Sequence, residues 1–147
     1  MPSGLYLLGS ASGGRRNLMT LNWATQVAAS PKLVLVSVEC GALTHELVAA
    51  SGAFTLNVLR REDRPVVRKF AKPAVDDGAT LAGLAVRASP GGLPILEQAM
   101  AWLECRVRTQ LSFDSHTAFV GEVADCGGEH PDGEVLRMED TRMNYGG

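Results

Sequence analysis

The sequence predicts a mainly β protein, a small antiparallel barrel or sandwich that carries two short helices. Several short runs alternate apolar and polar side chains, which is the period of a strand with one buried face. Turn-forming residues separate these runs at nearly regular spacing, as they do in barrels and sandwiches. The helical stretches are too few and too short to cross over between parallel strands, which argues against a doubly wound sheet.

The N-terminal part predicts a loop, two strands and a helix. Gly9–Gly14 (GSASGG) consists of small residues and is expected to be a flexible loop. Met19–Ala28 alternates and predicts one strand, whereas the continuous apolar run Leu33–Val38 predicts a strand buried on both faces. A short helix follows, for which Thr44 is the expected N-terminal cap and Gly52 the left-handed C-terminal cap.

The remaining chain predicts further strands around a second helix. Ala53–Leu59 alternates again, and a helix is expected to begin near Asp63, with Pro65 in its first turn and a break at Lys72–Pro73. Later strands are predicted at Leu84–Arg87, Ala101–Leu111, Thr117–Asp125 and Val135–Met138. The count is therefore six or seven strands and two helices.

The composition predicts a single domain over residues 1–147. Hydrophobic residues make up 46% of the chain and the net charge is −2, which is typical of a compact fold and not of disorder. No apolar stretch is long enough to span a bilayer and no secretory signal is visible, so we expect a cytoplasmic protein without a membrane partner. The slight negative charge and the 5% aromatic content argue against nucleic acid as a partner.

The cysteines predict free thiols in a reducing compartment. Their number is odd, they are widely spaced, and the chain has no Cys-x-x-Cys motif. Cys40 lies near His45, and Cys126 lies near His130, but each pair lacks two further ligands at usual spacing. No metal site is therefore expected.

Polar side chains within the Met19–Ala28 run suggest a binding surface. Thr20, Asn22 and Gln26 lie on one face of the expected strand, beside Trp23, and would need hydrogen-bond partners if buried. Amides suit a flat heterocycle with imide edges, and a nearby helix start with hydroxyl groups suits an anion. The alternative is that these side chains simply face solvent, and the pattern alone slightly favours it.

The chain contains no convincing catalytic constellation. Asp114 and His116 would share one side of a strand, where the carboxylate can tune the imidazole, but a polar turn is the favoured interpretation. Nucleophile-elbow, phosphate-loop and dinucleotide-binding motifs are all missing.

Gly13–Val27 (GGRRNLMTLNWATQV) resembles the opening segment of the flavin reductase-like family, which consists of FMN-binding split-barrel proteins. Further segments are similar to that family in the same order: Pro31–Glu39, Thr44–Val48 followed by Ser51–Leu59, Trp102–Cys105, His116 with Phe119–Val123, and Tyr145–Gly147. The resemblance implies a six-stranded antiparallel split β-barrel that forms a homodimer.

The resemblance also implies a flavin site, with FMN as the expected cofactor and FAD as an alternative. The implied binding residues are Thr20, Asn22, Trp23, Ala24, Thr25, Ser37, Val38, Glu39, Thr44 and His45. His116 is implied as the catalytic residue, near the nicotinamide of NADH or NADPH. The family's usual Gly-Asp before this histidine is replaced here by Asp114-Ser115, which weakens the case for efficient nicotinamide turnover.

Three functions follow from these observations. The leading hypothesis is NAD(P)H-dependent flavin reduction by hydride transfer to flavin N5, with a monooxygenase as one candidate acceptor of the reduced flavin. The flavin carries that chemistry, which explains why no acid or base constellation is needed. The alternatives are an FMN-binding electron-transfer or storage protein without NAD(P)H turnover, and a small barrel that binds no flavin.

Overall fold

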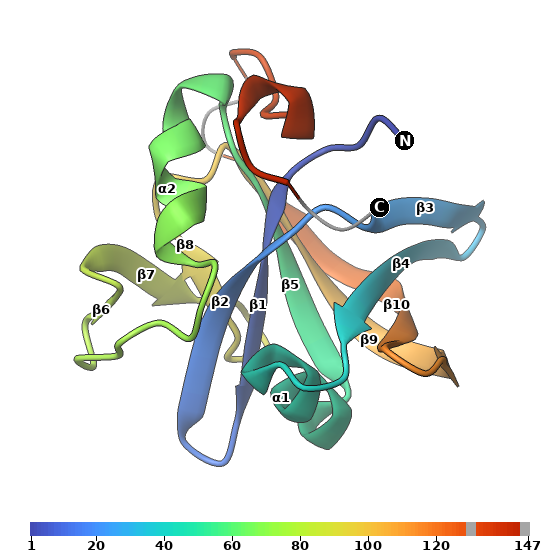
Figure 1. Ribbon diagram of the computed structural model, residues 1–147. Coiled ribbons are helices and arrows are strands. Elements are labelled where there is room, and N and C mark those ends of the chain that lie inside the picture. The colour runs from blue at the N-terminus through green and yellow to red at the C-terminus, as the bar shows by residue number, and fades with distance from the viewer. Residues whose placement is uncertain (129–131, 145–147) are drawn as a thin grey trace.

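The computed structural model describes residues 1–128 and 132–144, and its main feature is an antiparallel sheet (Figure 1). The spatial strand order is β2-β1-β5-β9-β10-β4-β3. These strands are β1 (Tyr6–Ser12), β2 (Arg15–Leu21), β3 (Ala24–Ala29), β4 (Lys32–Glu39), β5 (Ala53–Val58), β9 (Ala101–Ser112) and β10 (His116–Gly127). The prediction of a mainly β, antiparallel fold is confirmed.

A smaller sheet and short helices complete the fold. The small sheet comprises β6 (Thr80–Leu81), β7 (Leu84–Ala88) and β8 (Pro94–Leu96). The helices are α1 (Leu43–Ser51) and α2 (Arg64–Lys69), with two 3₁₀ turns, η1 (Arg61–Asp63) and η2 (Met138–Asp140). No helix in the described ranges is long and apolar enough to cross a membrane.

The expected single strand over Met19–Ala28 is broken at Asn22–Trp23. β2 pairs with β1 as far as Leu21, whereas β3 pairs with β4 from Ala24 onward. The two halves thus lie on opposite edges of the sheet, and the chain crosses from one edge to the other through this break (Figure 1). The break therefore turns one predicted strand into two, and the crossing brings both edges of the sheet to one place.

The predicted loop over Gly9–Gly14 is wrong for most of its length. Gly9–Ser12 belong to β1, and only Gly13 and Gly14 form a turn, with positive φ angles of 59° and 77°. Gly9 has a packing role there, because a Cβ at this position would collide with the Thr55 hydroxyl and the Pro94 carbonyl. At Gly9 the small residue therefore reflects close packing, whereas Gly13 and Gly14 have open space around them and serve the turn.

Two further predictions about strands need correction. β4 exists as expected, but it is not buried on both faces: Val34, Val36 and Val38 point into the core, and the residues between them are partly exposed. The predicted strand Val135–Met138 is wrong, since this segment makes only isolated bridges before η2 begins.

The helix boundaries are partly as predicted. Gly52 ends α1 in the left-handed conformation, and Asp63 is the residue at the N-cap of α2, with Pro65 in the first turn. Thr44 is not the cap of α1, because the helix begins at Leu43 and Ala42 takes the cap position. Thr44 instead lies in the first helical turn, fully buried.

The core consists of two clusters that hold the cavity-forming elements in place. One fills the barrel around Val36, Phe54 and Phe119, and the other lies beneath α2 around Phe70. Thr20 joins β2 to the end of α2, since its N–H donates to the Phe70 carbonyl (3.0 Å). The segment after α2 is thereby held beside β2.

Candidate functional site

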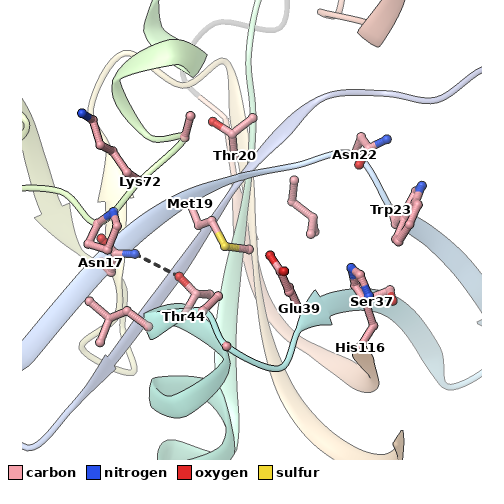
Figure 2. A pocket seen from close by; sticks show the side chains of 16 residues that line it. Asn17, Met19, Thr20, Asn22, Trp23, Ser37, Glu39, Thr44, Lys72 and His116 are labelled. Atoms are coloured by element: carbon pink, nitrogen blue, oxygen red, sulfur yellow. Dashed lines mark hydrogen bonds between the residues drawn. The ribbon is translucent and has the colours of Figure 1, made fainter. Parts of the chain in front are cut away.

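A cavity of about 570 Å³ opens where the β2–β3 crossing, the end of β4, the start of α1 and the segment after α2 meet (Figure 2). Its volume lies within the usual range for a small-ligand site. Seven residues predicted as site residues line it: Thr20, Asn22, Trp23, Ser37, Glu39, Thr44 and His116. The structure therefore gathers residues from distant parts of the chain into one place.

Four other predicted residues do not line this cavity. Val38 points into the barrel core, Ala24 packs against that core, and Thr25 is exposed on β3. His45 hydrogen-bonds to the Thr117 hydroxyl (2.8 Å), and its ring lies against Phe119. Strand alternation explains Val38, since neighbours in a strand point to opposite faces and both Ser37 and Glu39 line the cavity.

The polar side chains of the β2–β3 crossing differ in whether they have a hydrogen-bond partner. The Thr20 hydroxyl donates to the Val67 carbonyl (2.6 Å), whereas the Asn22 side-chain amide has no hydrogen-bond partner in the described part of the chain. Asn22 is only 8% exposed, and buried amides are normally paired. The solvent-facing interpretation is therefore wrong for Thr20 and Asn22 and holds only for Gln26.

The opposite side of the cavity is suited to an anion. No described side chain caps α1, so within the described ranges the first N–H groups of the helix lack acceptors, and they carry the positive end of its dipole. Thr44 accepts a hydrogen bond from Asn17, and no described residue accepts the proton of its hydroxyl. Lys72 lies across from the helix, with no ion-pair partner within 4.0 Å in the described ranges.

The mouth of the cavity carries two rings. The Trp23 and His116 ring centroids lie 4.9 Å apart with an interplanar angle of 51°. A polar turn joins β9 to β10, as favoured from the sequence, and Nδ1 of His116 hydrogen-bonds to the Ser115 hydroxyl (2.9 Å). Asp114 makes no hydrogen bond or ion pair with His116 in the described part of the chain, so the alternative of an Asp–His pair does not hold.

The segment that carries Lys72 is tied to β2 by a forked ion pair. Arg16 donates to both carboxylate oxygens of Asp76 (2.8 and 2.9 Å) and to the Gly78 carbonyl (2.9 Å). The hydrogen bond from Arg16, together with that from the Gly78 N–H, lowers the pKa of the Asp76 carboxyl. The anchored segment thus has a defined position beside the cavity.

Nine of the sixteen lining residues were not predicted as site residues, among them Asn17, Met19 and Lys72. Asn17 and Met19 lie within the segment that carries the family resemblance, but nothing in the pattern distinguished them from neighbouring strand residues. Lys72 was interpreted only as part of a helix break. The place of Lys72 at the cavity depends on the packing of the end of α2 against β2, which local sequence does not predict.

The lining fits a flavin better than a metal ion. A flat ring with an imide edge and a phosphate tail needs an unpaired amide, an apolar wall and an anion site, which Asn22, Trp23 and the α1 start supply. The described residues contain no group of three or more histidine, cysteine or acidic side chains placed to hold a metal.

Comparisons with known proteins agree with this fit. The chain is 35% identical to the NADH-dependent flavin reductase StyB of Pseudomonas fluorescens, over 74% of this chain and 61% of that protein. The styrene monooxygenase flavin reductase of Pseudomonas putida S12 superposes with a TM-score of 0.78 at 30% identity, covering 93% of this chain and 86% of that one. The NADH:FAD oxidoreductase of Streptomyces globisporus C-1027 superposes with a TM-score of 0.81 at 29% identity, covering 93% of this chain and 76% of that one.

The family model and the extent of the matches complete the comparison. The chain spans between 48% and 61% of the length of several curated relatives. The model of the flavin reductase like domain matches residues 1–146. Together with the split-barrel fold and the flavin-compatible cavity, this match shows that the chain belongs to the flavin reductase-like family.

Proposed function

We propose that this protein binds a flavin in the cavity and catalyses its reduction by a nicotinamide nucleotide. The observation that carries the proposal is that two donors without an acceptor among the described residues, the Asn22 amide and the Thr44 hydroxyl, converge on one cavity in a member of this family. Two similar proteins are named as NADH-dependent flavin reductases, which favours NADH as the electron donor.

Each part of the lining has a distinct task in this proposal. The Asn22 amide hydrogen-bonds to the polar edge of the ring, and Trp23 covers an apolar part of it. The α1 start, Thr44 and Lys72 hold the phosphate. The bound flavin supplies the capacity to accept a hydride, so these residues need only bind, orient and exclude water.

FMN is the flavin we favour, because the anion site consists of one helix start and one lysine, a donor set suited to a single phosphate. His116, at the mouth beside Trp23, is placed to orient the incoming nicotinamide. We further propose a cytoplasmic location and an acceptor such as a monooxygenase for the reduced flavin.

A homodimer is part of the proposal. Leu111 and Phe113 are 65% and 61% exposed, and Leu111 pairs with Ala118, which pairs with the cavity residue Ser37. A second copy that covers this apolar sheet face would also border the cavity. Replacing Leu111 by Glu is expected to give monomers in light scattering, whereas Val75→Glu, at an exposed apolar residue elsewhere, is expected to leave dimers.

The spectrum of the purified protein tests the catalytic proposal. Added FMN is expected to bind with quenched fluorescence, and anaerobic NADH is expected to bleach its visible absorbance within the stopped-flow range. Bleaching by dithionite but not by NADH or NADPH would instead identify an electron-transfer or storage protein. A protein that takes up neither FMN nor FAD would contradict both functions.

A further inference from the structure

A single buried amide connects the two halves of the anion site. Asn17, which lies on β2 and is 2% exposed, donates from Nδ2 to the Thr44 hydroxyl oxygen (3.0 Å; Figure 2). Its Oδ1 accepts a hydrogen bond from the Ala74 N–H (3.0 Å). Asn17 therefore links the first turn of α1 to the segment that carries Lys72.

The orientation of this amide follows from the chemistry of its partners. A backbone N–H can only donate, so the side-chain oxygen of Asn17 must face Ala74. The side-chain nitrogen then faces Thr44, and because it has no free lone pair, the Thr44 oxygen must accept. The single proton of the Thr44 hydroxyl is thereby turned away from Asn17.

That proton has no acceptor in the part of the chain that the structure describes, although Thr44 is fully buried and lines the cavity. A buried donor without a partner is costly, and an anion in the cavity removes the cost. The hydrogen bond from Asn17 thus presents the Thr44 hydroxyl to the cavity as a donor.

We propose that Asn17 is a positioning residue that makes the cavity select phosphorylated over unphosphorylated flavin. It does so by fixing the direction of the Thr44 hydroxyl and the spacing between the α1 start and the Lys72 segment. This inference rests on the proposed flavin binding. It adds that the phosphate preference depends on a residue that need not touch the ligand.

Asn57 provides a matched comparison within the same fold. It is also a buried amide on a strand, and it donates to the Leu7 carbonyl (3.2 Å) and accepts from the Leu96 N–H (2.9 Å). These backbone partners do not line the cavity. Asn57→Asp is therefore expected to lower the melting temperature without changing the ratio of the Kd values for riboflavin and FMN.

The sharpest variant is Asn17→Asp, which keeps the shape of the side chain. One carboxylate oxygen still accepts from Ala74, but the other now faces Thr44 without a proton. The Thr44 hydroxyl must then donate to Asp and is withdrawn from the cavity. We expect the Kd for FMN to rise roughly 10- to 100-fold, as for a lost hydrogen bond to a charged group, and the Kd for riboflavin less than about threefold.

Asn17→Asp also adds a negative charge, and Thr44→Val separates the two effects. In the Thr44→Val background no hydroxyl can be redirected, so the aspartate acts on FMN only through its charge. We expect Asn17→Asp to weaken FMN binding several-fold less in that background than in the wild type. Equal effects in both backgrounds would overturn the proposal, because they would assign the whole loss to charge.

The remaining outcomes are also decisive. Loss of FMN and riboflavin affinity by the same factor would overturn the proposal and indicate a structural role. If Asn17→Asp does not fold, as judged by circular dichroism, Asn17→Ala is measured instead. It is again expected to raise the Kd for FMN more than the Kd for riboflavin. Wild-type protein that binds neither flavin would overturn the proposed function, which is a different result from bound flavin without phosphate selectivity.

Discussion

The rings of Trp23 and His116 meet at the mouth of the cavity because both neighbour the end of β4. The Trp23 carbonyl accepts a hydrogen bond from the Ser37 N–H (2.9 Å), and His116 pairs with Glu39 at the start of β10. The centroid separation of 4.9 Å is therefore set by strand pairing and not by local sequence. Such a wall is suited to contact with a second flat ring.

Replacing His116 by Ala is expected to slow NADH-driven flavin reduction by roughly two- to tenfold, the usual range for one lost ring contact. FMN affinity is expected to change less than the rate, because the phosphate and ring edge keep their partners. Stopped-flow kinetics and FMN titration measure the two quantities. His45→Ala is the control, since that imidazole faces Thr117 and not the cavity. Equal losses of rate and affinity in His116→Ala would assign the histidine a structural role.

Replacing Asn22 by Ala is expected to raise the Kd for FMN about tenfold, because a largely buried ring edge loses its amide partner. The melting temperature is expected to stay nearly constant, since this amide makes no side-chain hydrogen bond to any described residue. Asn57→Ala is the matched control, in which stability falls and the affinity of the folded protein is retained. An unchanged FMN affinity in Asn22→Ala would exclude Asn22 from the binding site.

The Arg16–Asp76 ion pair predicts a pH-dependent stability. Because Arg16 lowers the pKa of the Asp76 carboxyl in the folded protein, this stabilisation is present above the unfolded value of about 3.9 and is lost as the pH falls through the folded value. Urea unfolding between about pH 6 and pH 2.5 measures it.

Asp76→Asn is expected to show a shallower loss of stability in acid than the wild type. The dependence does not vanish, since hydrogen bonds from Thr80 also lower the pKa of Asp77. Arg16→Met is expected to reproduce most of this change, and adding Asp76→Asn to it is expected to remove only the smaller part that the Gly78 N–H supplies. Parallel curves for the wild type and Asp76→Asn would contradict the assignment.

Periodicity predicted most strands but not their continuity. The alternation of Met19–Ala28 runs unbroken through Asn22–Trp23, so the sequence contains no mark of the crossing between sheet edges. β1 was missed because Gly9 and Ser10 are typical of loops, although both are buried in the structure. In both cases tertiary packing decided what local preference left open.

The site residues, like the strands, were predicted only in part from the sequence. A resemblance assigned three consecutive residues, Ser37, Val38 and Glu39, but a strand directs only every second side chain to one face, and Val38 lies in the core. Lys72 was not predictable, because its place depends on the Phe70 carbonyl docking on β2. Contacts between distant segments therefore supplied the residues that sequence reasoning missed.

Gly9→Ala is expected to destabilise the fold by roughly 1–3 kcal/mol, the usual cost of overpacking a filled site. A methyl group there would collide with the Thr55 hydroxyl and the Pro94 carbonyl, which are themselves hydrogen-bonded at 2.7 Å. Gly41→Ala is the control: a Cβ at Gly41 meets no atom within 4 Å, so the change is expected to stay within about 0.5 kcal/mol. Urea unfolding at neutral pH compares the two. If Gly9→Ala were as stable as Gly41→Ala, Gly9 would not lie in a packed strand and the loop interpretation of Gly9–Gly14 would be restored.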